Sequence, residues 1–171
     1  SLIGNVFQQG GRIKELTNIL DIHATILDLA KVKNTSHCDG RSVLPLVNKT
    51  SKKWENEIFI QISESQLARS LRTEKWKYCI ADQDSSGNDK PLSNQYTETN
   101  LYDLDADPYE LNNLIGISTY DEITTSLRKK IKNKIQKVEN ITSKIKKAKN
   151  VNNPGQMGLN PDSFHRLKKK L

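Results

Sequence analysis

The 171-residue sequence is poor in the side chains that build metal centres and disulfide frameworks. It has two cysteines and three histidines, which are Cys38, Cys79, His23, His37 and His165. Two cysteines cannot form a disulfide framework, and no C-x-x-C pair offers zinc ligands. We therefore expect no metal site in this chain and no acid–base centre built from histidine.

Apolar residues are also scarce. They make up 35% of the chain, and the mean hydropathy is −0.70. No apolar run approaches the ~20 residues that a membrane helix needs, so we expect no membrane-spanning segment. No signal peptide follows Ser1, which favours a cytoplasmic location. The chain opens without Met, however, so we expect it to lack its true N-terminus.

Positive charge is concentrated in the last third of the chain. Residues 1–118 hold 13 basic and 16 acidic side chains, whereas residues 119–149 hold 10 basic and 3 acidic ones. The positive net charge of +7 therefore comes from the residues after 118, because residues 1–118 have more acidic than basic side chains. These lysines lie opposite an aliphatic stripe that has neither Trp nor Phe, unlike most membrane-surface helices. We favour a solvated helix face over binding to nucleic acid or anionic membranes.

The spacing of apolar residues predicts two helices. Residues 16–32 form a wide apolar face, which needs a large covering surface such as a sheet, and Thr17 or Asp21 is expected to cap the start. Residues 121–148 carry a narrower aliphatic stripe, from Ile123 to Ile145, that predicts a long amphipathic helix.

Alternating apolar residues predict four strands, at residues 58–63, 67–72, 76–80 and 99–104. The second and third strands would be joined by a hairpin turn. Polar residues 82–98 predict a long loop, and residues 149–171 predict a basic tail with too few apolar residues to form a core.

Four cations surround the predicted hairpin: Arg69, Arg72, Lys75 and Lys77. The planar guanidinium of arginine fits a carboxylate, phosphate or sulfate, which makes Arg69 and Arg72 candidates for binding an anion. The other interpretation is that these cations are solvated or pair with acids of the same chain, such as Glu64, Glu74 or Asp103.

No complete catalytic motif is visible. The sequence has no G-x-S-x-G elbow, no glycine-rich phosphate loop and no H-E-x-x-H pair. Asp103, Asp105 and Asp107 alternate like the start of a calcium loop. Pro and Leu occupy the positions where that loop needs Gly and Glu, so we interpret the segment as a turn.

Four phrases of sequence occur in a characteristic order. They are LDIHATILDLA at 20–30, DGRSVLPLV at 39–47, RSLRTEKWKY at 69–78 and NLYDLDADPYELNNL at 100–114. Together they resemble the C-terminal third of the type I, formylglycine-dependent sulfatases of the alkaline-phosphatase-like superfamily. Ala24 stands where proline is usual in the first phrase.

The resemblance implies an α/β fold with three parts. Residues 1–50 would be the terminal segment of the sulfatase large domain, with a strand remnant at 1–13 and the helix at 16–32. Residues 51–148 would form the C-terminal subdomain, a four-stranded antiparallel sheet covered by a long helix. Residues 149–171 would be the basic tail. The helix at 16–32 would pack on the large domain, so we expect an exposed apolar face without it.

The resemblance also implies that the complete enzyme hydrolyses sulfate esters, with formylglycine and Ca²⁺ in its N-terminal domain. This chain has no C/S-x-P-x-R motif for making formylglycine, so we assign it no catalytic residue and no metal ligand. Its implied partners are the N-terminal sulfatase domain and a sulfated small molecule or glycan. Arg69, Arg72 and Glu64 would contact that substrate. The alternatives are a non-catalytic scaffold module derived from a sulfatase, or a basic-helix binder of nucleic acid or membranes.

We predict that the purified chain does not hydrolyse sulfate esters, because the formylglycine motif is missing. Chromophore release from an aryl sulfate, measured with and without Ca²⁺, should stay at the rate in buffer. Turnover that is lost when a residue of this chain is mutated would contradict this prediction.

Overall fold

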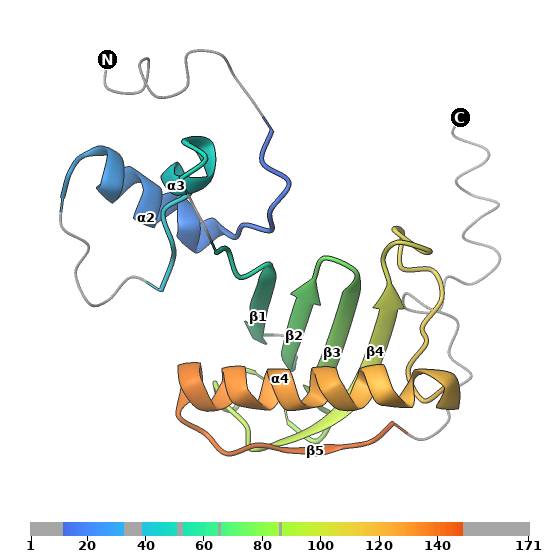
Figure 1. The fold of residues 1–171 in the computed structure, drawn as a ribbon. Helices are drawn as coiled ribbons and strands as arrows, with labels where there is room; N and C mark the ends of the chain where they lie inside the picture. Colours follow the sequence, from blue (N-terminus) through green and yellow to red (C-terminus); the bar gives the residue numbers. More distant parts are fainter. Residues whose placement is uncertain (1–11, 33–38, 51–52, 65, 86, 149–171) are drawn as a thin grey trace, which may run out of the picture. The chain divides into compact units, whose positions relative to one another are not determined.

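A computed structural model describes residues 12–32, 39–50, 53–64, 66–85 and 87–148. The tail predicted at 149–171 lies outside these residues, as does the strand remnant predicted at 1–13 apart from residues 12 and 13, which have no regular structure. The chain divides into two compact units, residues 1–58 and residues 59–171, and each is described by itself (Figure 1).

The first unit contains helix α2 (Ile19–Leu29) and the single turn α3 (Leu44–Val47). Helix α2 starts at Ile19, whereas the prediction placed the start at residue 16. Its N-cap is Asn18 and not Thr17 or Asp21. The Asn18 side chain accepts a hydrogen bond from the Leu20 N–H at 2.8 Å, and Asp21 accepts one from the Asn18 N–H at 2.9 Å. This reciprocal capping box satisfies main-chain donors that would otherwise lack partners at the helix start.

Hydrogen bonds hold the segment after residue 38 against α2. Asp21 Oδ1 accepts from the Arg41 N–H at 2.8 Å, and Thr25 Oγ1 accepts from the Val43 N–H at 3.0 Å. Gly40 approaches so closely that a Cβ there would lie 2.0 Å from a main-chain oxygen of α2. The first two phrases, residues 20–30 and 39–47, therefore pack against each other.

One side of α2 is uncovered within the described residues. Ile19, Ile22 and Ile26 follow helical spacing and are 80%, 59% and 58% exposed. Aliphatic side chains grouped in this way usually mark a surface that another element covers. The exposed apolar face predicted for this helix is therefore confirmed.

The second unit contains a sheet in which the strands follow chain order. They are β1 (Glu57–Ser63), β2 (Leu67–Thr73), β3 (Trp76–Asp82), β4 (Gln95–Asp103) and β5 (Lys144–Lys146). The pairs β2–β3 and β3–β4 are antiparallel, but β5 runs parallel to β4 (Figure 1). The predicted four antiparallel strands are present, and the prediction missed the fifth strand.

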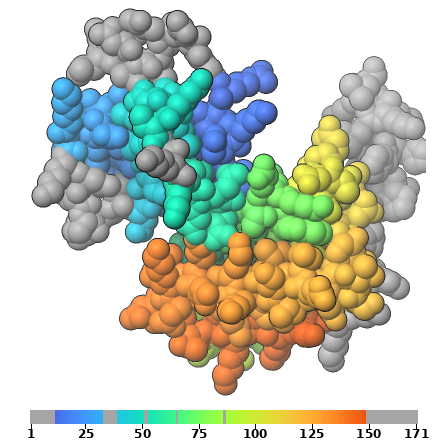
Figure 2. Space-filling model, in the orientation of Figure 1, coloured from blue at the N-terminus to red at the C-terminus, as the bar shows by residue number. Residues whose placement is uncertain are grey.

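Helix α4 (Asp121–Glu139) covers one face of this sheet. Its buried side chains Leu127, Ile131 and Ile135 join a core cluster with alternate residues of the strands, among them Leu71, Tyr78 and Leu101. Figure 2 shows the orange side chains of α4 forming one side of the second unit. The four-residue steps of the aliphatic stripe therefore explain how the helix docks.

The prediction of a helix through residue 148 was wrong. The helix ends at Glu139, where Asn140 adopts the left-handed conformation with φ of 56°. Asn tolerates this conformation and often ends helices in this way. The chain then reverses, and Ile145 lies in β5 beside Tyr96 of β4.

The predicted loop at 82–98 is also shorter than expected, since β4 begins at Gln95. Glu98 is buried there, and its carboxylate accepts hydrogen bonds from Tyr78 at 2.9 Å and from Arg128 at 2.7 Å. Burial and the nearby Glu98 carboxylate raise the pKa of Tyr78, so the phenol stays protonated and remains a donor. A polar strand residue is thus accommodated by partners distant in sequence.

The third and fourth phrases also meet in space. Lys77 Nζ lies 2.5 Å from Glu110, and Lys75 Nζ lies 3.4 Å from Asp103. Asn113 accepts from the Leu101 N–H at 2.9 Å, so its side chain pairs with the main chain of β4. These contacts fix the 104–114 segment beside the strands.

We predict that Leu127→Ala or Ile131→Ala lowers the free energy of unfolding by ~2–5 kcal/mol, because each change leaves a cavity in the core. Urea denaturation followed by circular dichroism would measure the loss. Replacing the exposed Lys129 and Lys137 with Gln should change stability by less than ~1 kcal/mol. Equal losses for both sets would show that α4 does not dock through its aliphatic stripe.

Candidate functional site

The Arg69 side chain lies on the α4 side of the sheet and is 1% exposed. Its Nε donates to the carboxylate of Glu139 at the end of α4. One terminal nitrogen donates to the Ile62 carbonyl at 2.9 Å, and the other donates to the Pro91 carbonyl at 3.2 Å. The guanidinium therefore joins β1, β2, the loop after β3 and the end of α4.

Arg72 lies on the opposite face of β2, as the three-residue separation from Arg69 predicts. It forms no hydrogen bond or ion pair with any residue that the structure describes, and its Nε is buried. Lys75 and Lys77 have the carboxylate partners named above. The hairpin cations are thus not one anion site, and Arg72 alone among the four lacks a described partner.

Glu64 is exposed at the end of β1 and is not brought together with either arginine within hydrogen-bonding distance. The loop after β3 lies directly against this connection. A Cβ on Gly87 would lie 2.3 Å from the Glu64 main-chain nitrogen, so only glycine permits this approach. The sequence interpretation treated Gly87 as part of the long polar loop at 82–98 and missed this contact. The substrate-binding role of Arg69, Arg72 and Glu64 stays a prediction.

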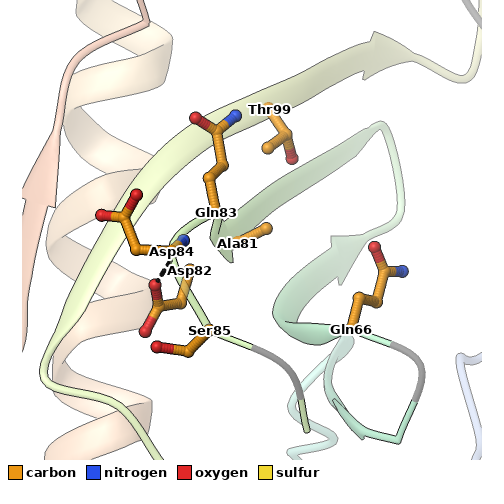
Figure 3. Close-up of a pocket in the computed structure, with 7 residues that line it drawn as sticks. All are labelled: Gln66, Ala81, Asp82, Gln83, Asp84, Ser85 and Thr99. Carbon is orange, nitrogen blue, oxygen red and sulfur yellow. Dashed lines mark hydrogen bonds between the residues drawn. The ribbon is translucent and has the colours of Figure 1, made fainter.

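An open hollow of about 580 Å³ lies where the β1–β2 connection and the loop after β3 meet the sheet. Figure 3 shows side chains from three strand regions around it. The lining residues are Gln66, Ala81, Asp82, Gln83, Asp84, Ser85 and Thr99. Two amides, two hydroxyls and the Asp84 carboxylate can exchange hydrogen bonds with a ligand rich in hydroxyl groups. No cation lines the hollow, which makes it a poor place for a sulfate.

Asp82 fixes one wall of this hollow. Burial raises the pKa of its carboxyl, but hydrogen bonds from Ser93, Lys90 and the Asp84 N–H outweigh burial and lower the pKa overall. The Ser93 hydroxyl donates at 2.7 Å, and the Asp84 N–H donates at 3.0 Å (Figure 3 draws the second bond). Asp82 is therefore a charged anchor for the loop and not a free carboxylate.

The described residues do not fit a calcium ion. No three His, Cys, Asp or Glu side chains among them are placed to hold a metal. Asp103 and Asp105 face Lys75, and Asp107 accepts from the Asn112 N–H at 2.7 Å. This acidic segment is a turn, as the sequence indicated. In the same part of the chain, no helix is long and apolar enough to cross a membrane.

Comparison with known proteins shows a family match along most of the chain. The family described as N-sulphoglucosamine sulphohydrolase, C-terminal, matches residues 3–137. Arylsulfatase K of Homo sapiens is 29% identical over 140 residues, which are 76% of this chain and 24% of that protein. The ulvan-active sulfatase of Formosa agariphila is 27% identical over 149 residues, covering 72% of this chain and 30% of that protein. The chain spans about a quarter of the length of such relatives.

Solved structures share this fold. BT1596, described as a 2-O GAG sulfatase, has a TM-score of 0.59 and 23% identity over 78% of this chain and 28% of its own. BT4656, solved with its substrate D-glucosamine-2-N,6-O-disulfate, has a TM-score of 0.57 and 22% identity over 70% of this chain and 24% of its own. At this level of identity the likeness establishes the fold.

We predict that Arg69→Ala lowers the free energy of unfolding by ~3–5 kcal/mol, because it leaves the buried Glu139 carboxylate without its cation. Chemical denaturation would measure the loss, with Arg72→Ala as the matched control. The control should cost little, since Arg72 has no described partner. The double change Arg69→Met and Glu139→Leu should recover much of the loss, and no recovery would argue against an ion-pair origin.

Proposed function

The chain belongs to the N-sulphoglucosamine sulphohydrolase C-terminal family, and we propose that it is the C-terminal region of a sulfatase that hydrolyses sulfate esters of a saccharide. The match over residues 3–137, which includes residues of both units, is the observation that carries this proposal. The family implies a formylglycine and a metal ion in the complete enzyme. The described residues contain no cluster of side chains placed to hold a metal, and the sequence lacks the C/S-x-P-x-R motif for formylglycine, so we assign the chemical step to the rest of the protein.

The relatives favour a saccharide as the substrate class. One structural neighbour was solved with a sulfated glucosamine, another is described as acting on glycosaminoglycans, and one relative is named for ulvan. A sulfated sugar carries both hydroxyl groups and anionic esters. The polar hollow suits the hydroxyl groups, through the amides of Gln66 and Gln83.

This chain would orient the substrate without reacting with it. Glu64 lies two residues before Gln66 on the same connection, and its exposed carboxylate can accept a hydrogen bond from a sugar hydroxyl. The Asp84 carboxylate would repel a sulfate at the hollow, so the ester would point away from this wall. The ester would then be free to enter the catalytic domain.

The exposed side of α2 supports the existence of that domain. Ile19, Ile22 and Ile26 present aliphatic surface that the described residues leave in solvent. Covering it would remove this surface from water at a gain of about 25 cal/mol per Å². The large domain that the family implies would supply the covering surface.

We predict that the complete protein releases sulfate from a sulfated saccharide and that Gln66→Ala or Gln83→Ala raises KM about 2–10-fold, since one hydrogen bond contributes roughly 0.5–1.5 kcal/mol. Ion chromatography of released sulfate would measure turnover. Lys129→Ala, on the exposed side of α4, is the control and should leave KM unchanged. A complete protein without turnover on any sulfated saccharide would refute the proposed function, whereas turnover with unaltered KM in both variants would refute only the role of the hollow.

A further inference from the structure

Strand β5 places two lysines on the face of the sheet that α4 does not cover. Ile145 packs on the core cluster, where it lies beside Tyr96 of β4. Lys144 and Lys146 alternate with Ile145 and therefore point to the opposite face. Both lysines are exposed, and neither ammonium group has a carboxylate partner within the described part of the chain.

The strand register sets these lysines beside the polar hollow. Lys146 is paired with Thr97 of β4, and Thr97 is paired with Ala81 of β3, which lines the hollow. Paired residues point to the same face and neighbouring strands lie roughly 4.8 Å apart, so Lys146 and Ala81 share this face at a separation of about 10 Å. Lys144 is paired with Gln95 on the same side. A cationic strand therefore lies close to a hollow whose described lining has no cation.

The hollow and the two lysines offer a ligand different chemistry. The amides and hydroxyls of the hollow exchange hydrogen bonds with neutral hydroxyl groups, whereas an ammonium group binds an anionic oxygen. A sulfated saccharide carries both kinds of group along one chain. The separation of about 10 Å is wider than one sugar ring, so the anionic group at the lysines would belong to the next sugar.

We propose that Lys144 and Lys146 form a sulfate-binding subsite for a second sugar of the substrate, next to the sugar that the hollow holds. This inference rests on the proposed function, which supplies the sulfated saccharide. The ester at this subsite is not the one that is hydrolysed, and the subsite would make the complete enzyme prefer chains with sulfate on neighbouring sugars. The family match ends at residue 137, so it does not account for these lysines.

The chemistry of β5 favours a sulfated saccharide over a nucleic acid or a membrane. Surfaces that bind single-stranded nucleic acids add aromatic side chains that stack on bases, and β5 has none. Its one apolar side chain, Ile145, packs on the core and does not face a bilayer. The structural alternative is that the lysines only protect an edge strand from the addition of further strands.

Isothermal titration calorimetry on the complete protein tests the proposal. The probe is a tetrasaccharide of a sulfated glycosaminoglycan, and the same tetrasaccharide after chemical desulfation is the reference. Changing both Lys144→Gln and Lys146→Gln should weaken binding of the sulfated probe about 3–30-fold, because two exposed charge pairs are lost, and should not affect the reference. Changing both to Arg should preserve binding. The matched control, Lys129→Gln with Lys137→Gln, removes the same charge from the exposed side of α4 and should change neither affinity.

Three results would overturn the proposal. Unaltered binding in the β5 Gln variant would leave its lysines as protection of the strand edge. An equal loss in the α4 control would show that total charge attracts the probe. Single-stranded DNA of matched charge that binds as tightly through the same lysines would show a surface without selectivity for saccharides.

Calorimetry does not depend on turnover, so failure of the proposed function is recognised separately. Ion chromatography of the same samples measures released sulfate. Binding that depends on the β5 lysines would support the subsite even if the complete protein released sulfate from no sulfated saccharide, which is the result that refutes the proposed function.

Discussion

The buried ion pair between Arg69 and Glu139 organises the second unit. It forms where α4 ends and the chain turns back towards β5, and the same guanidinium holds carbonyl groups of Ile62 and Pro91. Because a buried guanidinium must satisfy most of its donors, these segments have little freedom to move independently. The polar hollow and the connection that carries Glu64 both lie next to the segments that this pair holds.

The sequence allowed the framework to be predicted because the phrases behind the resemblance are hydrogen-bonded structures. Asp21 binds the Arg41 main chain, and Lys77 pairs with Glu110, so residues of separate phrases depend on each other. The strands at 58–63, 67–72 and 76–80 follow from alternation that packing on α4 requires. The exposure of the α2 isoleucines could also be predicted, because the apolar face of this helix needs a larger covering surface than the rest of the chain offers.

Features that depend on distant partners could not be predicted. Helical spacing continues through Ile141 and Ile145, but Asn140 ends the helix and Ile145 enters the sheet. Glu98 looked like a loop residue because the sequence alone does not show Tyr78 and Arg128 around it. The hairpin cations looked alike in sequence, and only tertiary structure separates the paired Arg69 from Arg72. No sequence pattern pointed to the hollow, because its lining residues come from separate segments of the chain.

Two sets of contacts occupy the outer side of β4. β5 pairs with residues 95–97 of β4, and Asn113 bonds to the main chain at Leu101 and Thr99. Unpaired main-chain groups at a strand edge are templates for addition of strands from other molecules. With these groups occupied, β4 is protected from that route to polymerisation. The opposite edge is β1, which carries the exposed Ile60 and Ile62, so at that edge an added strand would find both free main-chain groups and apolar side chains to cover.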